Sequence, residues 1–269
     1  MPLLIVFITE RMYHSNMYQQ SLEDIPDMQE IKKLNSFFTT VAWLGNPRIL
    51  YFFYILSINL MPKPAALYIW CSTASISYLT ECLKSMYGED RPYWVSDNIK
   101  SSQCEVTFGN PSGLMLNNVF FWITVYLHAY YEVGVRYPRM SVFCTAYIIK
   151  MALTCLGISL LIFMGFSRGY MGVGAYNEVI FGTLLGATLA FIGHYVVKPK
   201  FLNMPETLYS AGDGSQYAVT CLSYFKAIFA GLLIPLFFAL LILLGITERA
   251  FHHAHEYRVR QSRAGCSSA

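Results

Sequence analysis

The sequence has few charged residues and no paired-cysteine motif. Only 13% of its 269 residues are charged, whereas a soluble globular domain carries about 25%. The seven cysteines show no CxxC spacing, so neither a disulfide framework nor a zinc site is predicted. The net charge is only +3 and the basic residues form no stripe, which argues against a nucleic-acid-binding protein. We therefore expect no nucleic-acid partner, no metal and no cofactor.

Long apolar runs, in contrast, are abundant. Hydrophobic residues make up 55% of the chain, and the mean hydropathy is +0.41. A helix that crosses a bilayer needs about 20 mostly apolar residues. We therefore predict an all-α fold, a polytopic membrane helix bundle with about six transmembrane helices. The predicted spans are residues 48–61, 64–84, 113–134, 142–166, 173–197 and 220–246.

The order of these runs divides the chain into three parts. Residues 1–46 form an N-terminal segment, of which roughly 28–44 is amphipathic enough to lie on a membrane surface. Residues 47–246 form the membrane core, and residues 247–269 form a polar, basic tail. Six spans place both ends of the chain on one face of the membrane. The bias of basic residues between the two faces is slight, so it indicates the orientation only weakly.

Three short polar segments are predicted to share the face of the chain ends. KSMYGEDRPYWV begins with Lys84 and contains Arg91, NPSGL contains Ser112 and Gly113, and SRGYMGVGAYNEV contains Arg168. Three cations beside a tight turn and helix N-termini form a cradle for phosphate. Taken singly, basic residues at span ends anchor the membrane interface, and a Pro-Ser-Gly turn caps a helix. Their combination favours an anion site.

These segments resemble the motifs of a known superfamily, that of type 2 phosphatidic acid phosphatases, vanadium haloperoxidases and glucose-6-phosphatases. Its motifs are K-x6-RP, PSGH and SR-x5-H-x3-D. The sequence carries the first complete at Lys84, Arg91 and Pro92, then PSG at 111–113 and SR at 167–168. RPYWV and the position of two spans before the lysine most resemble the glucose-6-phosphatase branch.

The resemblance covers roughly residues 40–200 and implies a phosphate site. The phosphate-binding residues that it implies are Lys84, Arg91, Ser112, Gly113 and Arg168. The chain departs from the family at the reactive positions. Leu114 stands where PSGH has histidine, Gly174 where SR-x5-H has histidine, and Glu178 where the family has aspartate. In the family the second histidine attacks phosphorus, the aspartate orients it, and the first histidine protonates the leaving oxygen.

The other histidines are poor substitutes. His128 lies about 21 Å and His194 about 30 Å along their helices from Leu114 and Gly174, at a rise of about 1.5 Å per residue. His14 lies on the correct face but in a terminal segment. The tail contains the remaining three, His252, His253 and His255. Rescue of the reaction from these terminal segments stays open.

Because leucine and glycine supply neither a nucleophile nor an acid, we expect no catalytic residues and no enzyme activity. The predicted function is that of an inactive accessory or scaffolding subunit of a membrane complex, able to bind a phosphate or an anionic lipid head group. The alternative is an active lipid- or sugar-phosphate phosphatase with an atypical nucleophile. Expected partners are membrane lipids, including anionic phospholipid, and other membrane protein subunits. The mitochondrial inner membrane and the endoplasmic reticulum both suit these interpretations.

Overall fold

The structure is a computed structural model that describes residues 1–199 apart from 62, 97, 102–104, 106 and 137–139. Its regular elements are helical throughout this part of the chain. The all-α fold is therefore confirmed there. The predicted span at 220–246 and the tail at 247–269 lie outside the described residues.

Five long helices match the apolar runs. They are α3 (Pro47–Leu60), α4 (Lys63–Tyr87), α6 (Gly113–Arg136), α7 (Met140–Tyr170) and α8 (Tyr176–Ile192), the last continuing as a π-helical turn, η2 (Gly193–Val197). The predicted boundaries agree with these helices to within about four residues. The agreement follows from a simple cause: an apolar run with no internal proline or charge cluster hydrogen-bonds all its backbone groups most readily as a helix.

The N-terminal part differs from the expectation. One helix, α1 (Pro2–Glu30), occupies most of the N-terminal segment, for which a helical stretch was predicted only at 28–44, and its internal Pro26 does not interrupt it. The predicted amphipathic stretch at 28–44 is divided by a short 3₁₀ turn, η1 (Lys32–Leu34), and only α2 (Asn35–Leu44) follows. α1 packs on α8 and α2 packs on α7, so both helices gain their stability from contacts that local sequence does not reveal.

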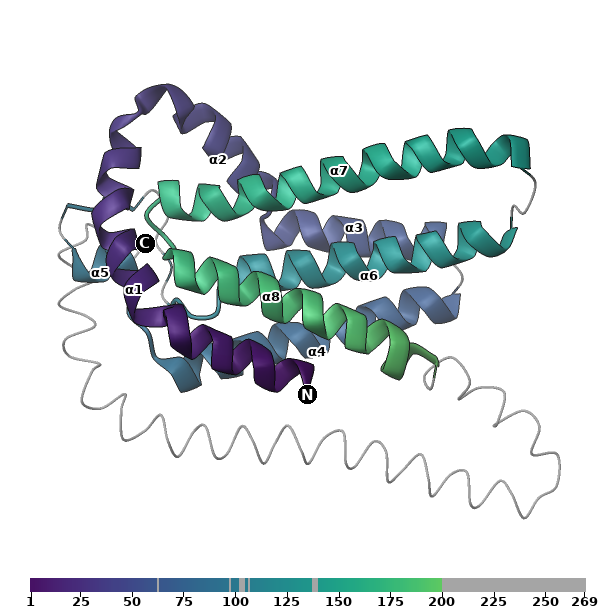
Figure 1. The fold of residues 1–269 in the computed structure, drawn as a ribbon, viewed down its shortest axis with the longest axis horizontal. Coiled ribbons are helices and arrows are strands. Elements are labelled where there is room, and N and C mark those ends of the chain that lie inside the picture. The colour runs from purple at the N-terminus through teal and green to yellow at the C-terminus, as the bar shows by residue number, and fades with distance from the viewer. Residues whose placement is uncertain (62, 97, 102–104, 106, 137–139, 200–269) are drawn as a thin grey trace, which may run out of the picture.

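The long helices run roughly parallel to one another, so their ends lie at the two opposite ends of the bundle, which we call its poles. α4 and α7 end at the pole that carries α5 (Pro92–Val95), and α6 and α8 begin there (Figure 1). The core at this pole is formed where α6 packs on α4 and α8, around Leu116, Phe120, Phe181 and Leu185. The predicted phosphate-binding residues lie at this same pole, at the ends of α4 and α7 and at the start of α6.

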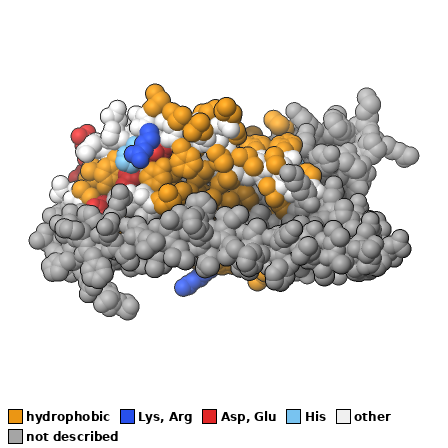
Figure 2. All heavy atoms as spheres, turned by 90° about the horizontal axis from the view of Figure 1, so that it is seen from below, with side chains coloured by type: hydrophobic (Ala, Val, Ile, Leu, Met, Phe, Trp, Pro, Cys, Tyr) orange, Lys and Arg blue, Asp and Glu red, His pale blue; other side chains and the backbone are white. Residues whose placement is uncertain are grey.

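The exterior of the bundle is largely apolar. On the face seen in Figure 2, hydrophobic side chains cover most of the described surface, and charged side chains gather toward one end. Within the described residues, one helix is long and apolar enough to cross a membrane by length and composition, Tyr176–Val197, and two shorter apolar helices lie at Arg48–Ser57 and Thr154–Tyr170. Exposed Ile158, Ile162 and Phe166 on α7 are typical of a surface that faces lipid.

Candidate active site

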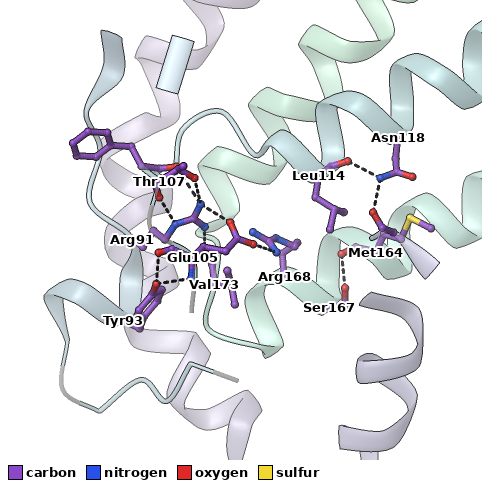
Figure 3. A network of polar contacts seen from close by, with 12 residues as sticks. Arg91, Tyr93, Glu105, Thr107, Leu114, Asn118, Met164, Ser167, Arg168 and Val173 are labelled. Atoms are coloured by element: carbon purple, nitrogen blue, oxygen red, sulfur yellow. Dashed lines mark hydrogen bonds and ion pairs between the residues drawn. The ribbon is translucent and has the colours of Figure 1, made fainter. Parts of the chain in front are cut away.

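Arg91 is the most firmly held residue of the site. Only 1% of it is exposed. Its Nε donates to the Thr107 carbonyl at 2.6 Å, its Nη1 to the Val173 carbonyl at 2.6 Å and its Nη2 to the Phe108 carbonyl at 3.1 Å. These carbonyls belong to two loops that are far apart in sequence. Arg91 therefore joins the connection before α6 to the connection between α7 and α8 (Figure 3).

Glu105 bridges two buried arginines. Its Oε2 lies 2.6 Å from Nη2 of Arg91, and its Oε1 lies 2.7 Å from Nη1 of Arg168 (Figure 3). Burial raises the pKa of Glu105, but the charges of Arg168 and Arg91 outweigh it and bring the pKa down to about 2. The carboxylate is therefore ionised at neutral pH and binds both guanidinium groups as an anion.

No pattern in the sequence distinguishes Glu105. It lies in the polar loop before the Pro-Ser-Gly turn. In such a loop neither a hydrophobic periodicity nor a motif spacing predicts where a side chain points. An acidic side chain within a strongly basic constellation was the only available signal. Charge balance alone would have placed some carboxylate near the arginines, but it would not have distinguished Glu105 from Glu81 or Glu89.

Lys84 joins the same constellation from the last turn of α4. Its Nζ donates to Glu81 Oε1 at 2.8 Å and to Thr107 Oγ1 at 3.3 Å. Arg91 Nη2 donates to the same Thr107 hydroxyl at 3.3 Å. Thus Lys84 and Arg91 share Thr107, and Arg91 and Arg168 share Glu105. The structure brings the three predicted cations together.

The Pro-Ser-Gly turn lies against Lys84 and α8. Ser112 donates its backbone N–H to the Glu178 carbonyl at 3.1 Å, and its hydroxyl is buried without a hydrogen-bond partner among the described residues. A Cβ on Gly113 would come within 3.0 Å of Lys84 Nζ, so glycine permits the close approach of the lysine. Asn110 Nδ2 donates to the fully buried Glu10 at 3.2 Å, which ties the turn to α1.

Leu114 and Gly174, the positions predicted to correspond to the family's histidines, differ in what surrounds them. Leu114 packs against Gly45 and within a cluster that includes Val41, Met115 and Met164, so an apolar side chain fills its space. Gly174 instead faces polar atoms. A Cβ placed on it would lie 3.3 Å from Glu178 Oε2 and 3.8 Å from Arg168 Nε.

Glu178 is the second carboxylate beside the arginines. Only 1% of it is exposed, and neither carboxylate oxygen has a hydrogen-bond partner within the described part of the chain. Arg168 Nε, also buried, lacks one there as well. Because buried polar groups are nearly always paired, these atoms indicate the place of a small polar ligand or of water.

A cavity of about 210 Å³ adjoins Lys84. Glu105, Gly113 and Leu114 also line it. Leu50 and the tyrosines of α3, Tyr51 and Tyr54, line the rest together with polar groups of α4 and α6. Glu105 therefore lies between the cavity and the two arginines that it binds.

His14 and His128 make their contacts with groups other than Gly174. His14 Nε2 lies 3.0 Å from Glu89 Oε2 and 3.8 Å from Glu10 Oε1, and the three atoms nearest to a Cβ on Gly174 belong to Glu178 and Arg168. His128 Nδ1 lies 2.7 Å from Nζ of Lys198, at the pole opposite the cations. The tail histidines, His252, His253 and His255, lie outside the described residues.

Comparison with known proteins supports a phosphatase fold. The chain is similar to a crystal structure of a transmembrane PAP2-type phosphatidylglycerolphosphate phosphatase from Bacillus subtilis, with a TM-score of 0.58 and 21% sequence identity over 72% of this chain and 92% of that one. No curated protein matches the sequence. With the apolar exterior, this likeness indicates an integral membrane protein.

The interpretation of the chain as a non-enzyme is contradicted by these comparisons, which point toward a phosphatase. It rested on leucine at 114 and glycine at 174, the positions where the resemblance implies the family's histidines. The family model of the PAP2 superfamily matches residues 65–202, which include Lys84, Arg91, the Pro-Ser-Gly turn and Arg168. The chain belongs to the PAP2 superfamily.

Proposed function

We propose that the protein is a membrane phosphatase that hydrolyses a phosphate monoester of a lipid or a sugar. The observation that carries this proposal is the anion already bound at the site: two buried arginines hold the carboxylate of Glu105. A phosphate group offers oxygens to the same guanidinium groups and carries more negative charge than a carboxylate. Lys84 and Gly113 line the cavity, and Lys84 shares Thr107 with Arg91. Together with Ser112, whose buried hydroxyl has no hydrogen-bond partner among the described residues, they complete the set of proposed phosphate ligands.

The nucleophile that we propose is the carboxylate of Glu178. We take Leu114 and Gly174 to stand at the family's histidine positions. Glutamate is one methylene longer than the family's aspartate, and Glu178 Oε2 reaches within 3.3 Å of a Cβ on Gly174. The carboxylate thus occupies the space that a histidine would fill, beside Arg168. A carboxylate that attacks phosphorus and forms an acyl phosphate is a known form of nucleophilic catalysis.

The reaction then has two balanced steps. In the first, a Glu178 oxygen bonds to phosphorus, the ester P–O bond breaks, and the leaving oxygen takes a proton from the Lys84 ammonium group. In the second, water attacks the phosphorus of the acyl phosphate, the Glu178 carboxylate leaves, and the proton of the water returns to Lys84. Arg91 and Arg168 offset the charge on the transferred phosphoryl oxygens in both steps.

Phosphate release by the full-length protein in mild detergent tests this proposal, with phosphatidic acid, phosphatidylglycerolphosphate and glucose 6-phosphate as substrates. We expect saturable hydrolysis of one of them. Arg168→Ala should abolish hydrolysis and binding together. Glu178→Gln should reduce the rate at least ~100-fold while inorganic phosphate still binds.

Hydroxylamine trapping separates the nucleophile from the fold. Wild-type protein incubated with substrate and hydroxylamine should acquire a hydroxamate at residue 178, which mass spectrometry of the peptide detects. Unimpaired hydrolysis by Glu178→Gln would exclude this nucleophile. Wild-type protein that releases no phosphate from any of the three substrates would contradict the proposed function.

The branch of the superfamily, the membrane that holds the protein and its partners stay predictions. RPYWV supports the glucose-6-phosphatase-like branch and hence the endoplasmic reticulum, whereas a role beside other subunits would suit the mitochondrial inner membrane. Anionic phospholipids and partner subunits are tested by the same preparation: mass spectrometry of proteins and lipids that co-purify in mild detergent identifies both. Fractionation of cell membranes decides between the two locations.

A further inference from the structure

Glu105 occupies the position that a bound phosphate would need. Its two oxygens accept from Arg91 and Arg168 at 2.6 and 2.7 Å, which are the charge-assisted contacts that these side chains offer to phosphate oxygens. Because each guanidinium nitrogen offers few hydrogens, a phosphate cannot gain these two contacts while the carboxylate keeps them. One anion excludes the other.

We propose that Glu105 is an intramolecular competitor that closes the phosphate site until a phosphate displaces it. The inference rests on the proposed function, because it concerns the same site. In this inference Glu105, which lies outside the three motifs, controls how tightly the site binds its ligand. A competitor attached to the same chain acts at a high effective concentration, in the millimolar range for short flexible links.

The backbone around Glu105 lets the carboxylate leave without moving the loop. Tyr93 donates its hydroxyl hydrogen to the Glu105 carbonyl at 2.8 Å, and the Glu105 N–H donates to the same hydroxyl oxygen at 3.2 Å. These bonds hold the main chain on α5. The side chain itself is 32% exposed and lines the cavity, so it can rotate into that space.

The arginines differ in how much they depend on Glu105. Arg91 keeps three backbone carbonyls as acceptors when the carboxylate leaves, so its position is retained. Arg168 Nη1 has Glu105 as its ion-pair partner, and its Nε has no hydrogen-bond partner among the described residues. A structural salt bridge alone would not explain why one arginine is held fully by other groups while the bridging carboxylate borders a cavity.

The test is the binding of inorganic phosphate to the full-length protein in detergent, measured by calorimetry. Glu105→Gln removes the competing charge and keeps the shape of the side chain. We expect it to bind phosphate about 10- to 100-fold more tightly than wild type, because a charge-assisted contact no longer has to be broken. Glu23→Gln is the matched control: it changes the net charge equally, at an exposed position on α1, and should leave the affinity unchanged.

A second readout covers the case in which Glu105→Gln folds poorly. Two buried arginines then lack an anion, and phosphate supplies one. We expect phosphate to raise the melting temperature of Glu105→Gln by several degrees more than that of wild type or Glu23→Gln. Tyr93→Phe removes the hydroxyl that holds the backbone of Glu105 and should tighten phosphate binding by a smaller factor.

Equal phosphate affinity and equal thermal response in wild type, Glu105→Gln and Glu23→Gln would overturn the inference. Its failure is distinguishable from that of the proposed function. If Glu105→Gln gains affinity but no variant hydrolyses a substrate, the competitor stands and the phosphatase proposal fails. If wild type hydrolyses a substrate and Glu105→Gln gains no affinity, the reverse holds.

Discussion

The two carboxylates beside the arginines of the site are placed very differently. Glu105 lies on the cavity side, 32% exposed, and both its oxygens are paired with guanidinium groups. Glu178 lies on the α8 side, almost fully buried, and both its oxygens lack a hydrogen-bond partner within the described residues. The same arginines therefore have as neighbours one carboxyl group whose oxygens are paired and one whose oxygens are not.

Under the two proposals made above, this difference separates binding from chemistry. A paired, ionised carboxylate is a good ligand for a cation and a poor nucleophile, because its electron pairs are already engaged. An unpaired carboxylate buried against glycine is costly to the fold, and such a cost is typical of functional positions. We therefore assign Glu105 to the control of binding and Glu178 to the reaction, and variants on each side can test that division.

Removal of Arg91 should have the largest effect on stability and on phosphate binding. Arg91→Ala leaves three carbonyls without their donor, and each unsatisfied buried group costs about 1–3 kcal/mol. We expect a large fall in melting temperature and loss of phosphate binding. Arg91→Lys should recover part of the stability but little of the binding, because lysine cannot donate to several acceptors in the same plane. Full phosphate affinity in Arg91→Lys would contradict a site built on the planar guanidinium group.

Restoration of the family's nucleophile sharpens the role assigned to Glu178. Gly174→His alone places a side chain against Glu178 Oε2, whereas Gly174→His with Glu178→Asp shortens the carboxylate and makes room. We expect the double variant to hydrolyse substrate about 100-fold faster than Gly174→His alone, a gain of the size that a positioned proton-transfer group contributes. Phosphate-release assays on both variants check this. Equal rates would mean that Glu178 does not compete with a histidine for that space.

A matched pair of glycine substitutions tests the position of the Glu178 carboxyl group through steric packing. A Cβ on Gly109 would overlap the Glu178 carboxyl group, while a Cβ on Gly157 in α7 meets nothing within 4 Å. We expect Gly109→Ala to lower stability by about 1–3 kcal/mol, the usual cost of overpacking, and to reduce hydrolysis. Gly157→Ala should leave hydrolysis unchanged and should not lower stability, because alanine suits a helix interior better than glycine. Thermal unfolding and phosphate release measure both effects, and an unaffected Gly109→Ala would place Glu178 elsewhere.

The smallest expected effect is the pH dependence of the Glu105 ion pairs. The pKa of Glu105 falls from 4.5 to about 2 in the folded protein, despite its burial, because Arg168 and Arg91 stabilise the charged form. Its contribution to stability is therefore complete above about pH 4.5 and is lost as the pH falls toward 2. The melting temperature of wild type should approach that of Glu105→Gln as the pH is lowered from about 6 to about 3. A difference that stays constant over this range would show that the ion pairs contribute nothing.

Part of the fold was predictable because a membrane imposes a strong rule on sequence. Long apolar runs with few charges form helices, so the runs at 113–134 and 142–166 predicted α6 and α7 closely. The polar segments between such runs must stay at the surface of the membrane. Alternation of the spans across the membrane therefore predicted one shared pole for Lys84, Arg91 and Arg168. The run at 220–246 lies outside the described residues and stays a prediction.

Other features had no local signal. α1 carries charges in no helical period, and its fully buried Glu10 is bound by Asn110, a hundred residues away. Glu105 lies in a loop whose direction no pattern sets. Its contact with two arginines depends on Tyr93 and on the meeting of α7 with the loop before α6.

The sequence by itself determined the helical class and the pole at which the cations gather, because hydrophobic length and motif order are local properties of the chain. The tertiary structure alone decided which carboxylates stand beside those cations, since loop direction and side-chain reach depend on contacts between distant segments. Gly174 appeared in the sequence as a missing nucleophile. In the fold, its absent side chain leaves space that the Glu178 carboxylate enters beside Arg168.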